Sequence, residues 1–583
     1  MSNAAPRASE IRLGMRIDWD VPIAMEDGLI LRADLFRPDK PGRYPVLISY
    51  GAFGKGLAFQ DGNKSAWDRM IAAYPEVAQG SSCIFQNWEV VDPEKWVPHD
   101  YACLRIDARG SGQSPGFLDP WSPREAQDIF HSIAWAAGQD WCSGKVGMNG
   151  ISYYAINQWH VAQLQPPNLA AICVWEGASD WYREFTRHGG IHSQFLDNLY
   201  PRAFHRVQYG LGSRGLRSRA TGEFVSGQPD LTDAELSANR IDIEHLSRAH
   251  PFDDDACRAR SVDFSRVTVP LLSAANWGGQ GLHTRGNFEG YLAAASEQKW
   301  LEAHGDAHWT HFYTDYGVAL QRRFFDYFLK ETDTGWSEQP RVQLNIRHPD
   351  EHFVRRAESE WPLARTVWTK YHLHPSTMTL SPTANDATIT LTYDALGDGL
   401  EFSTPSLTEP FEITGPIAAR LHISADSTDA DLFLTLRLID PAGQEITFIG
   451  SNDPRTPVAI GWLRASHRKL DPVRSTPWRP WHSHDEAWPL QPGVPVPLDI
   501  EIWPSCITVP PGYRLCLSVR GKDYENAGPP PKLDGVLYTL TGVGPFRHVT
   551  KQDRPANIFG GTCQLHTGPD FENYLLLPII PGS

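Results

Sequence analysis

Long apolar runs are missing from this 583-residue chain, and so is an excess of positive charge. No stretch reaches the ~18 apolar residues that a membrane-spanning helix needs. The first residues, Met-Ser-Asn-Ala-Ala-Pro-Arg, lack the apolar segment of a secretory signal. A formal net charge of −16 argues against nucleic acid or an anionic membrane surface as the main partner. These absences predict a cytoplasmic protein.

Metal-binding signatures are missing as well. The eight cysteines are widely spread and form no C-x-x-C pair, so zinc-ribbon and thioredoxin-like sites have little support. His188 and His192 have the i, i+4 spacing of some zinc ligands, but the H-E-x-x-H arrangement is absent. We therefore expect neither a metal nor a cofactor.

Aromatic and apolar residues, by contrast, are plentiful. Hydrophobic residues make up 41% of the chain and charged residues 21%, as in ordinary globular proteins, and 21 residues are tryptophan. A chain of this length exceeds one hydrophobic core and predicts two to four domains. Frequent tryptophan suits large cores and aromatic-lined pockets for small organic molecules.

Strand and helix patterns alternate through the first part of the chain. Apolar runs typical of buried strands occur at 45–50, 101–107, 146–148, 169–176, 267–274 and 299–304. Helical periodicity is found at 123–138, after Ser152, around 285–297 and at 317–330. This alternation predicts a mostly parallel sheet with helices on both faces, formed by residues 1–177 and 263–338. Residues 178–262 interrupt it with charged and aromatic helical segments, which indicate an inserted helical cap.

After Pro340 the pattern becomes one of alternating strands. Leu432, Leu434, Leu436 and Leu438 have the period of two that places side chains on one face of a strand. Proline and glycine separate many such segments. Residues 339–583 are therefore predicted to form an all-β sandwich of the jelly-roll type.

Ser152 has the sequence context of a catalytic nucleophile. Val146 to Met148 read as a strand that ends at Gly150, and a helical pattern begins just after the serine. Strand, serine and helix in this order form the nucleophile elbow, whose full motif is G-x-S-x-G. Here Tyr154 replaces the last glycine, and a serine that merely caps a helix is the commoner alternative.

The chain order of an α/β-hydrolase triad locates a matching base. The order is serine, acid, histidine, with the histidine in the loop after the last strand. His308 lies in the loop that follows the predicted strand 299–304. Its neighbours His304 and His311 are rival candidates, and His304 is better placed inside the strand.

Several stretches together resemble the serine hydrolase family that includes cocaine esterase, α-amino-acid ester hydrolases and X-prolyl dipeptidyl peptidases. The similar stretches span nearly the whole chain: 25–38, 107–112, 150–153, 175–180 and 461–468. The resemblance implies an α/β-hydrolase domain with an inserted helical cap, followed by a C-terminal jelly roll. This is the same organisation that the strand and helix patterns predict.

The resemblance also implies catalytic roles. Ser152 would be the nucleophile and His308 the base that accepts its proton. The oxyanion hole would combine the backbone N–H of Tyr153 with the hydroxyl of a tyrosine after an early strand, and Tyr50 stands at that position. An aromatic residue that fills the core at the end of a strand is the alternative for Tyr50.

The acid of the triad departs from the family pattern. Relatives carry Trp-x-Asp after the strand that corresponds to 267–274, whereas Gly279 occupies the place of the aspartate here. Glu176 is the best substitute, because it ends the strand that follows the elbow helix and keeps the order serine, acid, histidine. Asp180 is the runner-up, and a structural ion pair is the alternative role of Glu176.

Three functions compete. The first is a serine hydrolase that cleaves carboxylic esters, or lactones and activated amides, of small organic molecules through an acyl-enzyme. The second is an X-prolyl-type dipeptidyl aminopeptidase, which needs carboxylates to hold the free amine of its substrate. The third is a catalytically degenerate protein that binds carbohydrate through its jelly roll. The expected partner is a small-molecule ester, and homo-oligomerisation is left open.

Overall fold

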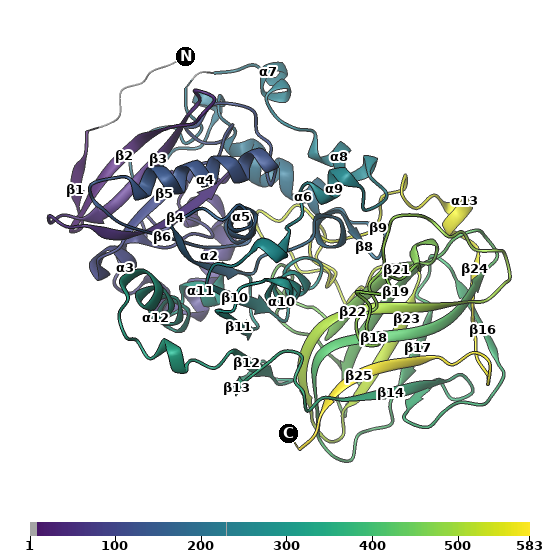
Figure 1. Cartoon of the computed structure of the whole chain (residues 1–583). Coiled ribbons are helices and arrows are strands. Elements are labelled where there is room, and N and C mark those ends of the chain that lie inside the picture. The colour runs from purple at the N-terminus through teal and green to yellow at the C-terminus, as the bar shows by residue number, and fades with distance from the viewer. Residues whose placement is uncertain (1–7, 229, 583) are drawn as a thin grey trace.

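The computed structural model describes residues 8–228 and 230–582. The first part of the chain forms an 11-stranded sheet in the order β1-β2-β3-β5-β4-β6-β7-β10-β11-β12-β13 (Figure 1). The strands from β5 to β12 run parallel to one another. They are β5 (Ala102–Asp107), β4 (Tyr44–Gly51), β6 (Cys142–Ile151), β7 (Leu169–Trp175), β10 (Leu271–Asn276), β11 (Lys299–His304) and β12 (Val342–Arg347).

Antiparallel strands complete both edges of the sheet. They are β1 (Glu10–Arg12), β2 (Met15–Ala24) and β3 (Ile30–Pro38) at one edge and β13 (Phe353–Glu358) at the other. Residues 10–12 therefore form an edge strand of the sheet.

Helices cover both faces of the parallel strands. α4 (Pro123–Ala137) and α5 (Tyr153–Ala162) pack on the face that carries Val46 and Ile48. α12 (Asp315–Lys330) packs on the opposite face, which carries Leu47. Successive residues of β4 thus point into different cores, as the pleat of a strand requires, and every residue of β4 is buried. The predicted helix-covered parallel sheet is confirmed.

Residues 57–98, between β4 and β5, form an insertion that contains short helices. These are α1 (Phe59–Gly62), α2 (Lys64–Ala73) and α3 (Pro93–Trp96). Trp67 and Trp96 of this insertion are buried in the core beneath the sheet. Packing of these indoles, rather than helical periodicity in the sequence, holds the segment in place.

The segment predicted as a cap contains several short helices joined by loops. It contains α6 (Phe195–Leu199), α7 (Asp233–Ala238), α8 (Ile243–Ala249), α9 (Asp255–Arg258) and the π-helical turns 181–186 and 200–204. The segment also contains a short hairpin of two-residue strands, β8 (Arg187–His188) and β9 (Ile191–His192), which no sequence pattern indicated. α10 (His283–Ala293) and α11 (Thr310–Tyr313) belong to the sheet domain that resumes afterwards.

Two strands that follow the predicted domain boundary at residue 339 pair with the sheet of the first part of the chain. β12 pairs with β11 in parallel, with Leu301 opposite Val342, and β13 pairs with β12. Figure 1 shows both strands beside β11. Val342, Leu344 and Ile346 alternate as sandwich strands do, so the pattern by itself could not assign them to the sheet.

The C-terminal part is an all-β domain that closes on itself. β18 pairs with β22 on one side and with β25 on the other, so the strand ladder forms a closed circuit. Leu432, Leu434, Leu436 and Leu438 point into its core, which confirms the predicted alternation. Its strands are β14 (Val367–His374), β15 (Thr379–Ser381), β16 (Thr390–Asp394), β17 (Leu400–Ser403), β18 (Phe411–Ala425), β19 (Asp431–Ile439), β20 (Glu445–Ile446), β21 (Ala459–Arg464), β22 (Val496–Val509), β23 (Arg514–Arg520), β24 (Thr562–His566) and β25 (Tyr574–Ile580). One short helix, α13 (Ala556–Phe559), lies in this domain.

Across the described residues, no helix has the length and apolar character needed to cross a membrane.

Candidate active site

Ser152 occupies a strained turn between β6 and α5. Its φ and ψ are 54° and −114°, outside the regions that non-glycine residues favour. The backbone N–H of Ser152 donates to the carbonyl oxygens of Trp175 (3.0 Å) and Glu176 (3.2 Å), which anchors the turn to the end of β7. A Cβ on Gly150 would lie 2.5 Å from Tyr154 Cβ, so only glycine fits there. The geometry is that of a nucleophile elbow.

Tyr154 stands at the position of the second elbow glycine, and Gly51 on another strand gives its ring room. A Cβ on Gly51, at the end of β4, would lie 2.5 Å from the ring of Tyr154. The absence of a side chain at residue 51 therefore provides the space that the motif normally gains from its second glycine. This compensation allows Ser152 to keep the elbow geometry without the full motif.

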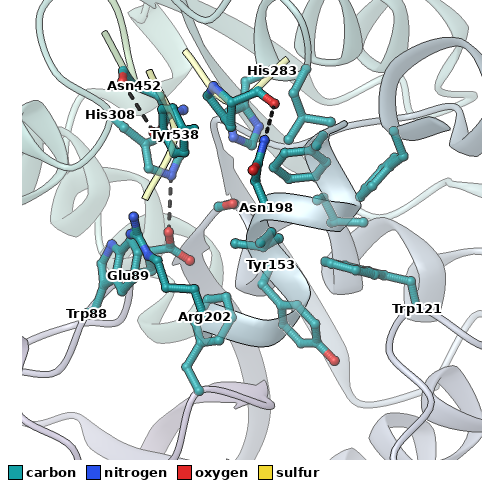
Figure 2. Close-up of a pocket in the computed structure, with 18 residues that line it drawn as sticks. Trp88, Glu89, Trp121, Tyr153, Asn198, Arg202, His283, His308, Asn452 and Tyr538 are labelled. Atoms are coloured by element: carbon teal, nitrogen blue, oxygen red, sulfur yellow. Dashed lines mark hydrogen bonds and ion pairs between the residues drawn. The ribbon is translucent and has the colours of Figure 1, made fainter. Parts of the chain in front are cut away.

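His308 lies in the loop after β11 and shares a pocket with Ser152 (Figure 2). Its Nδ1 is 2.8 Å from Oε2 of Glu176. Burial opposes the charged imidazole, but the neighbouring carboxylates outweigh it and raise the pKa of His308 to about 10. The rival His304 is turned toward Glu302 (2.6 Å) and Glu176 (3.3 Å).

Glu176 supports the imidazole from the end of β7. The residue is fully buried and has a φ of 48°, so it begins a tight turn directly after the strand. Asn276 donates to its Oε1 (3.1 Å) and Ser451 donates to its Oε2 (2.9 Å). Burial alone would raise the pKa of Glu176, but His308 and His304 hold it well below its usual value. The carboxylate is therefore ionised and fixed in orientation.

Gly279 lies in a turn where an added side chain would meet close neighbours. A Cβ there would lie 3.1 Å from Oγ1 of Thr284 and 3.2 Å from Cβ of His283. Asn276, at the end of β10, instead donates an amide hydrogen to Glu176. The strand that lacks the aspartate thus helps to orient the carboxylate supplied by the neighbouring strand.

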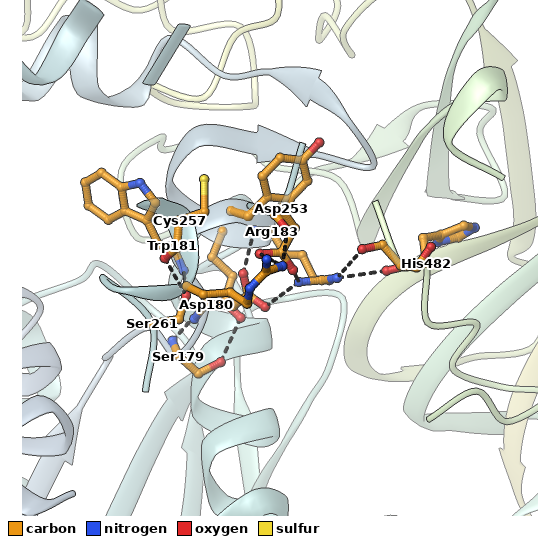
Figure 3. Close-up of polar contacts among 12 residues, drawn as sticks. Ser179, Asp180, Trp181, Arg183, Asp253, Cys257, Ser261 and His482 are labelled. Atoms are coloured by element: carbon orange, nitrogen blue, oxygen red, sulfur yellow. Dashed lines mark hydrogen bonds and ion pairs between the residues drawn. The ribbon is translucent and has the colours of Figure 1, made fainter. Parts of the chain in front are cut away.

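The runner-up acid, Asp180, does not contact His308. It accepts hydrogen bonds from Arg183, at 2.9 Å from the backbone N and 2.8 Å from Nη1. Arg183 also pairs with Asp253 at 2.8 Å, as Figure 3 shows. Asp180 belongs to an ion-pair network under the cap, so the geometry excludes it as the partner of the imidazole.

The expected role of Tyr50 in the oxyanion hole is not supported. Tyr50 is fully buried in the core between the sheet and α4, and its hydroxyl accepts a long hydrogen bond from the N–H of Arg109 (3.4 Å). Phe53, three residues later, lines the pocket. The chain turns away from the strand after Gly51, so the aromatic residue that reaches the pocket carries no hydroxyl.

Tyr50→Phe is accordingly expected to change kcat for ester hydrolysis less than about threefold. A donor that stabilises an oxyanion would cost about 100-fold or more when removed. Steady-state kinetics with a p-nitrophenyl ester measures the difference. A loss of that larger size would place the Tyr50 hydroxyl in the reaction after all.

The backbone N–H of Tyr153 lies at the elbow, where the sequence predicts a donor of the oxyanion hole. It is the first residue of α5, where N–H groups lack intrahelical acceptors. The N–H groups of Ala155 and Ile156 donate to the carbonyl of Ser152, and within the described residues no acceptor is found for the N–H of Tyr153. The helix dipole also favours negative charge at this end.

The pocket above Ser152 has about 610 Å³ of empty space, a volume that includes solvent at its open mouth. Sheet domain, cap and β-domain all contribute to its walls. The apolar lining residues are Phe53, Trp88, Trp121, Ile156, Phe185, Phe195, Leu199, Leu282 and Pro545. A cavity lined by many apolar and aromatic residues with a few polar groups is typical of a site for small organic molecules.

Comparison with known proteins agrees with this architecture. The family model described as X-Pro dipeptidyl-peptidase (S15 family) matches residues 27–313, and the model of the X-Pro dipeptidyl-peptidase C-terminal non-catalytic domain matches residues 334–574. A crystal structure of a CocE/NonD family hydrolase from Staphylococcus aureus is 31% identical, with a TM-score of 0.82, over 97% of this chain and 94% of that one. The chain belongs to the S15 family. The family resemblance expected from the sequence is confirmed.

More distant similar proteins carry different enzyme names. Cocaine esterase from Rhodococcus sp. (strain MB1 Bresler) is 24% identical over 96% of this chain and 98% of its own length. An aminopeptidase from a marine sediment Thaumarchaeota archaeon shares the fold, with a TM-score of 0.67 at 16% identity, over 99% of this chain and 96% of its own. The chain is thus a hydrolase of the S15 family that shares its fold with this aminopeptidase.

Sequence reasoning missed one residue of this S15 site. Glu89, in the insertion 57–98, places its Oε1 3.1 Å from Nε2 of His308 (Figure 2). The available signal was a single carboxylate within the apolar run Trp88-Glu-Val-Val91. An unpaired acid in a buried segment usually has a functional or ionic partner. Its partner lies 219 residues away, so no local pattern could identify it.

Proposed function

We propose that the protein is a serine hydrolase that cleaves carboxylic esters of small organic molecules through an acyl-enzyme. The single observation that supports this most strongly is the joint placement of the elbow residue Ser152 and the Glu176-bound His308 in one pocket. The sheet domain is proposed to be an α/β-hydrolase domain, and the β-domain a jelly roll. The esterase name of the Rhodococcus relative supports the same reaction class.

In the proposed acylation, Oγ of Ser152 attacks the ester carbonyl carbon. The hydroxyl proton passes to Nε2 of His308, while Glu176 accepts the hydrogen bond from Nδ1 and stabilises the imidazolium. The carbonyl oxygen becomes an oxyanion that the N–H of Tyr153 can bind. Collapse of the intermediate breaks the bond to the alcohol oxygen, which leaves with the proton from Nε2.

Deacylation repeats these steps with water. His308 takes a proton from the water as its oxygen attacks the acyl carbon, and the proton returns to Oγ of Ser152 as the acid leaves. The strained turn at residue 152 holds the serine oxygen in position for both steps. Three parts of the chain enclose the pocket, which restricts it to small or medium-sized esters, including lactones and activated amides.

X-prolyl peptidase activity is the second candidate. The description of the matching family model favours it. Such a peptidase must bind a protonated amine, and among the described residues that line the pocket the carboxylate is Glu89, which is already bonded to His308. The ester hypothesis needs no such amine site and is therefore preferred.

Parallel assays with a p-nitrophenyl acyl ester and an X-Pro anilide test this choice. We expect hydrolysis of the ester and no release from the anilide above the background set by Ser152→Ala. Ser152-dependent cleavage of the anilide at a kcat/KM equal to or above that of the ester would favour the peptidase.

We also propose a cytoplasmic location. The eight cysteines are buried free thiols, which supports it.

A further inference from the structure

Two carboxylates hold His308 from opposite sides. Glu176 lies 2.8 Å from Nδ1 and Glu89 lies 3.1 Å from Nε2. In Figure 2 the carboxylate of Glu89 points up to the imidazole from the segment that carries Trp88. Among the described residues, the hydrogen-bond partner of Nε2 is Glu89 and not Ser152. A triad base normally keeps this nitrogen for the serine hydroxyl.

The backbone keeps Glu89 next to the elbow. Its carbonyl oxygen accepts a hydrogen bond from the N–H of Ile151 (2.9 Å), the residue before the serine. Its φ is 67°, an unusual value for glutamate. The side chain is 2% exposed, and Oε2 has no hydrogen-bond partner within the described residues. The fold thus maintains a strained, half-satisfied carboxylate beside Ser152.

The charges around His308 and Glu89 favour a proton on Nε2, between the two side chains. Both carboxylates stabilise the imidazolium form of His308, and this form cannot accept a proton from Ser152. His283 stacks on His308 with 4.7 Å between ring centroids and stays neutral, since burial and His308 lower its pKa to about 3. The other titratable or charged groups that interact with Glu89 are Arg202, Tyr154 and Tyr313. His304 and His311 interact with Glu176.

We propose that Glu89 is a positioning residue that controls the protonation of His308: its carboxylate holds a proton on Nε2 in the resting enzyme, and this proton must leave before Ser152 can react. As the pH rises the proton passes from Nε2 to solvent, which leaves a neutral imidazole beside the carboxylate of Glu89. Nε2 then has a free lone pair for the hydroxyl proton of Ser152. The inference rests on the proposed role of His308 as the base.

Glu89→Gln tests the proposal through the pH profile of kcat/KM. The base must be neutral, so activity falls as pH decreases through the pKa of His308. Removing a negative charge at 3.1 Å lowers that pKa. We expect the acidic limb to move down by about 1 pH unit or more, the usual effect of a close opposite charge. Glu94→Gln, in the same segment but bonded to Ser82, is the matched control and should leave the limb in place.

Carbethoxylation of His308 by diethyl pyrocarbonate provides a readout that needs no activity. The reagent attacks only the neutral imidazole, so the modification rate of the His308 peptide, followed by mass spectrometry, reports its protonation directly. The Glu89→Gln protein should react at lower pH than the wild type, whether or not esters are hydrolysed. An inactive enzyme with this shift would reject the esterase proposal and retain the role of Glu89.

An acidic limb and a modification profile that both stay within about 0.3 pH unit of wild type would overturn the proposal, since a charge at this distance should shift a pKa by more. Circular dichroism establishes that the variant is folded. If Glu89→Gln does not fold, Glu89→Asp serves in its place, because the shorter side chain withdraws the charge from Nε2 and should move both profiles in the same direction. Unchanged profiles in a folded Glu89→Asp protein would count equally against the proposal.

Discussion

Glu176→Gln is expected to lower kcat/KM for ester hydrolysis by about 10³- to 10⁴-fold near neutral pH. The amide retains the size of the side chain but removes the negative charge 2.8 Å from Nδ1 of His308. The imidazolium formed during acylation then loses its stabilising partner. The new amide group could also present an N–H to Nδ1 and favour the wrong tautomer. Steady-state kinetics of the purified variant measures the loss.

Asp180→Asn is the matched control for this prediction. Asp180 lies four residues further along the chain but pairs with Arg183, so its removal weakens the ion-pair network and leaves His308 untouched. We expect kcat/KM to stay within about threefold of wild type, while the thermal stability falls because a buried pair is broken. Full activity in Glu176→Gln together with a large loss in Asp180→Asn would reverse the assignment, and full activity in both would reject both residues.

Ser152→Ala is expected to reduce kcat by about 10⁴-fold or more, because loss of the nucleophile removes the covalent pathway. The remaining rate would come from binding and from the oxyanion donor alone. Alanine is close to serine in size and the turn is held by backbone hydrogen bonds, so the fold should persist. Ser265→Ala, whose hydroxyl bonds to Asp263 far from the pocket, should retain wild-type kinetics. Residual activity within tenfold of wild type would rule out Ser152 as the nucleophile.

The nucleophile could be predicted because its signal is local. A strand, a glycine, a serine and a helix lie within one short segment, and the structure places them in that order. The missing second glycine could not be explained locally, since Gly51 on another strand provides the space for Tyr154. Helix and strand periodicity likewise predicted the layers of the sheet domain.

The supporting residues were harder to predict because they depend on distant neighbours. Glu176 and Asp180 are close in sequence, and only the tight turn after β7 decides which one reaches His308. Tyr50 and Phe53 lie on either side of another turn, which sends one into the core and the other into the pocket. Sequence spacing gives the order of such residues but not the direction in which their side chains point.

Glu89 and the strands β12 and β13 illustrate the same limit at longer range. The sequence of the insertion 57–98 has little helical periodicity, because its helices are short and its order comes from tryptophan packing. β12 joins the sheet through its pairing with β11, an interaction that alternation alone cannot distinguish from pairing within a sandwich. Long-range pairing is the information that a single sequence lacks.

Labelling with a fluorophosphonate probe tests the central claim most directly, because only an activated serine attacks the phosphorus and displaces fluoride. The account predicts one stoichiometric adduct on the wild-type protein, mapped by mass spectrometry to the peptide that contains Ser152, and none on Ser152→Ala. Absence of labelling across the pH range in which the protein is folded, or an adduct on a different serine, would contradict it.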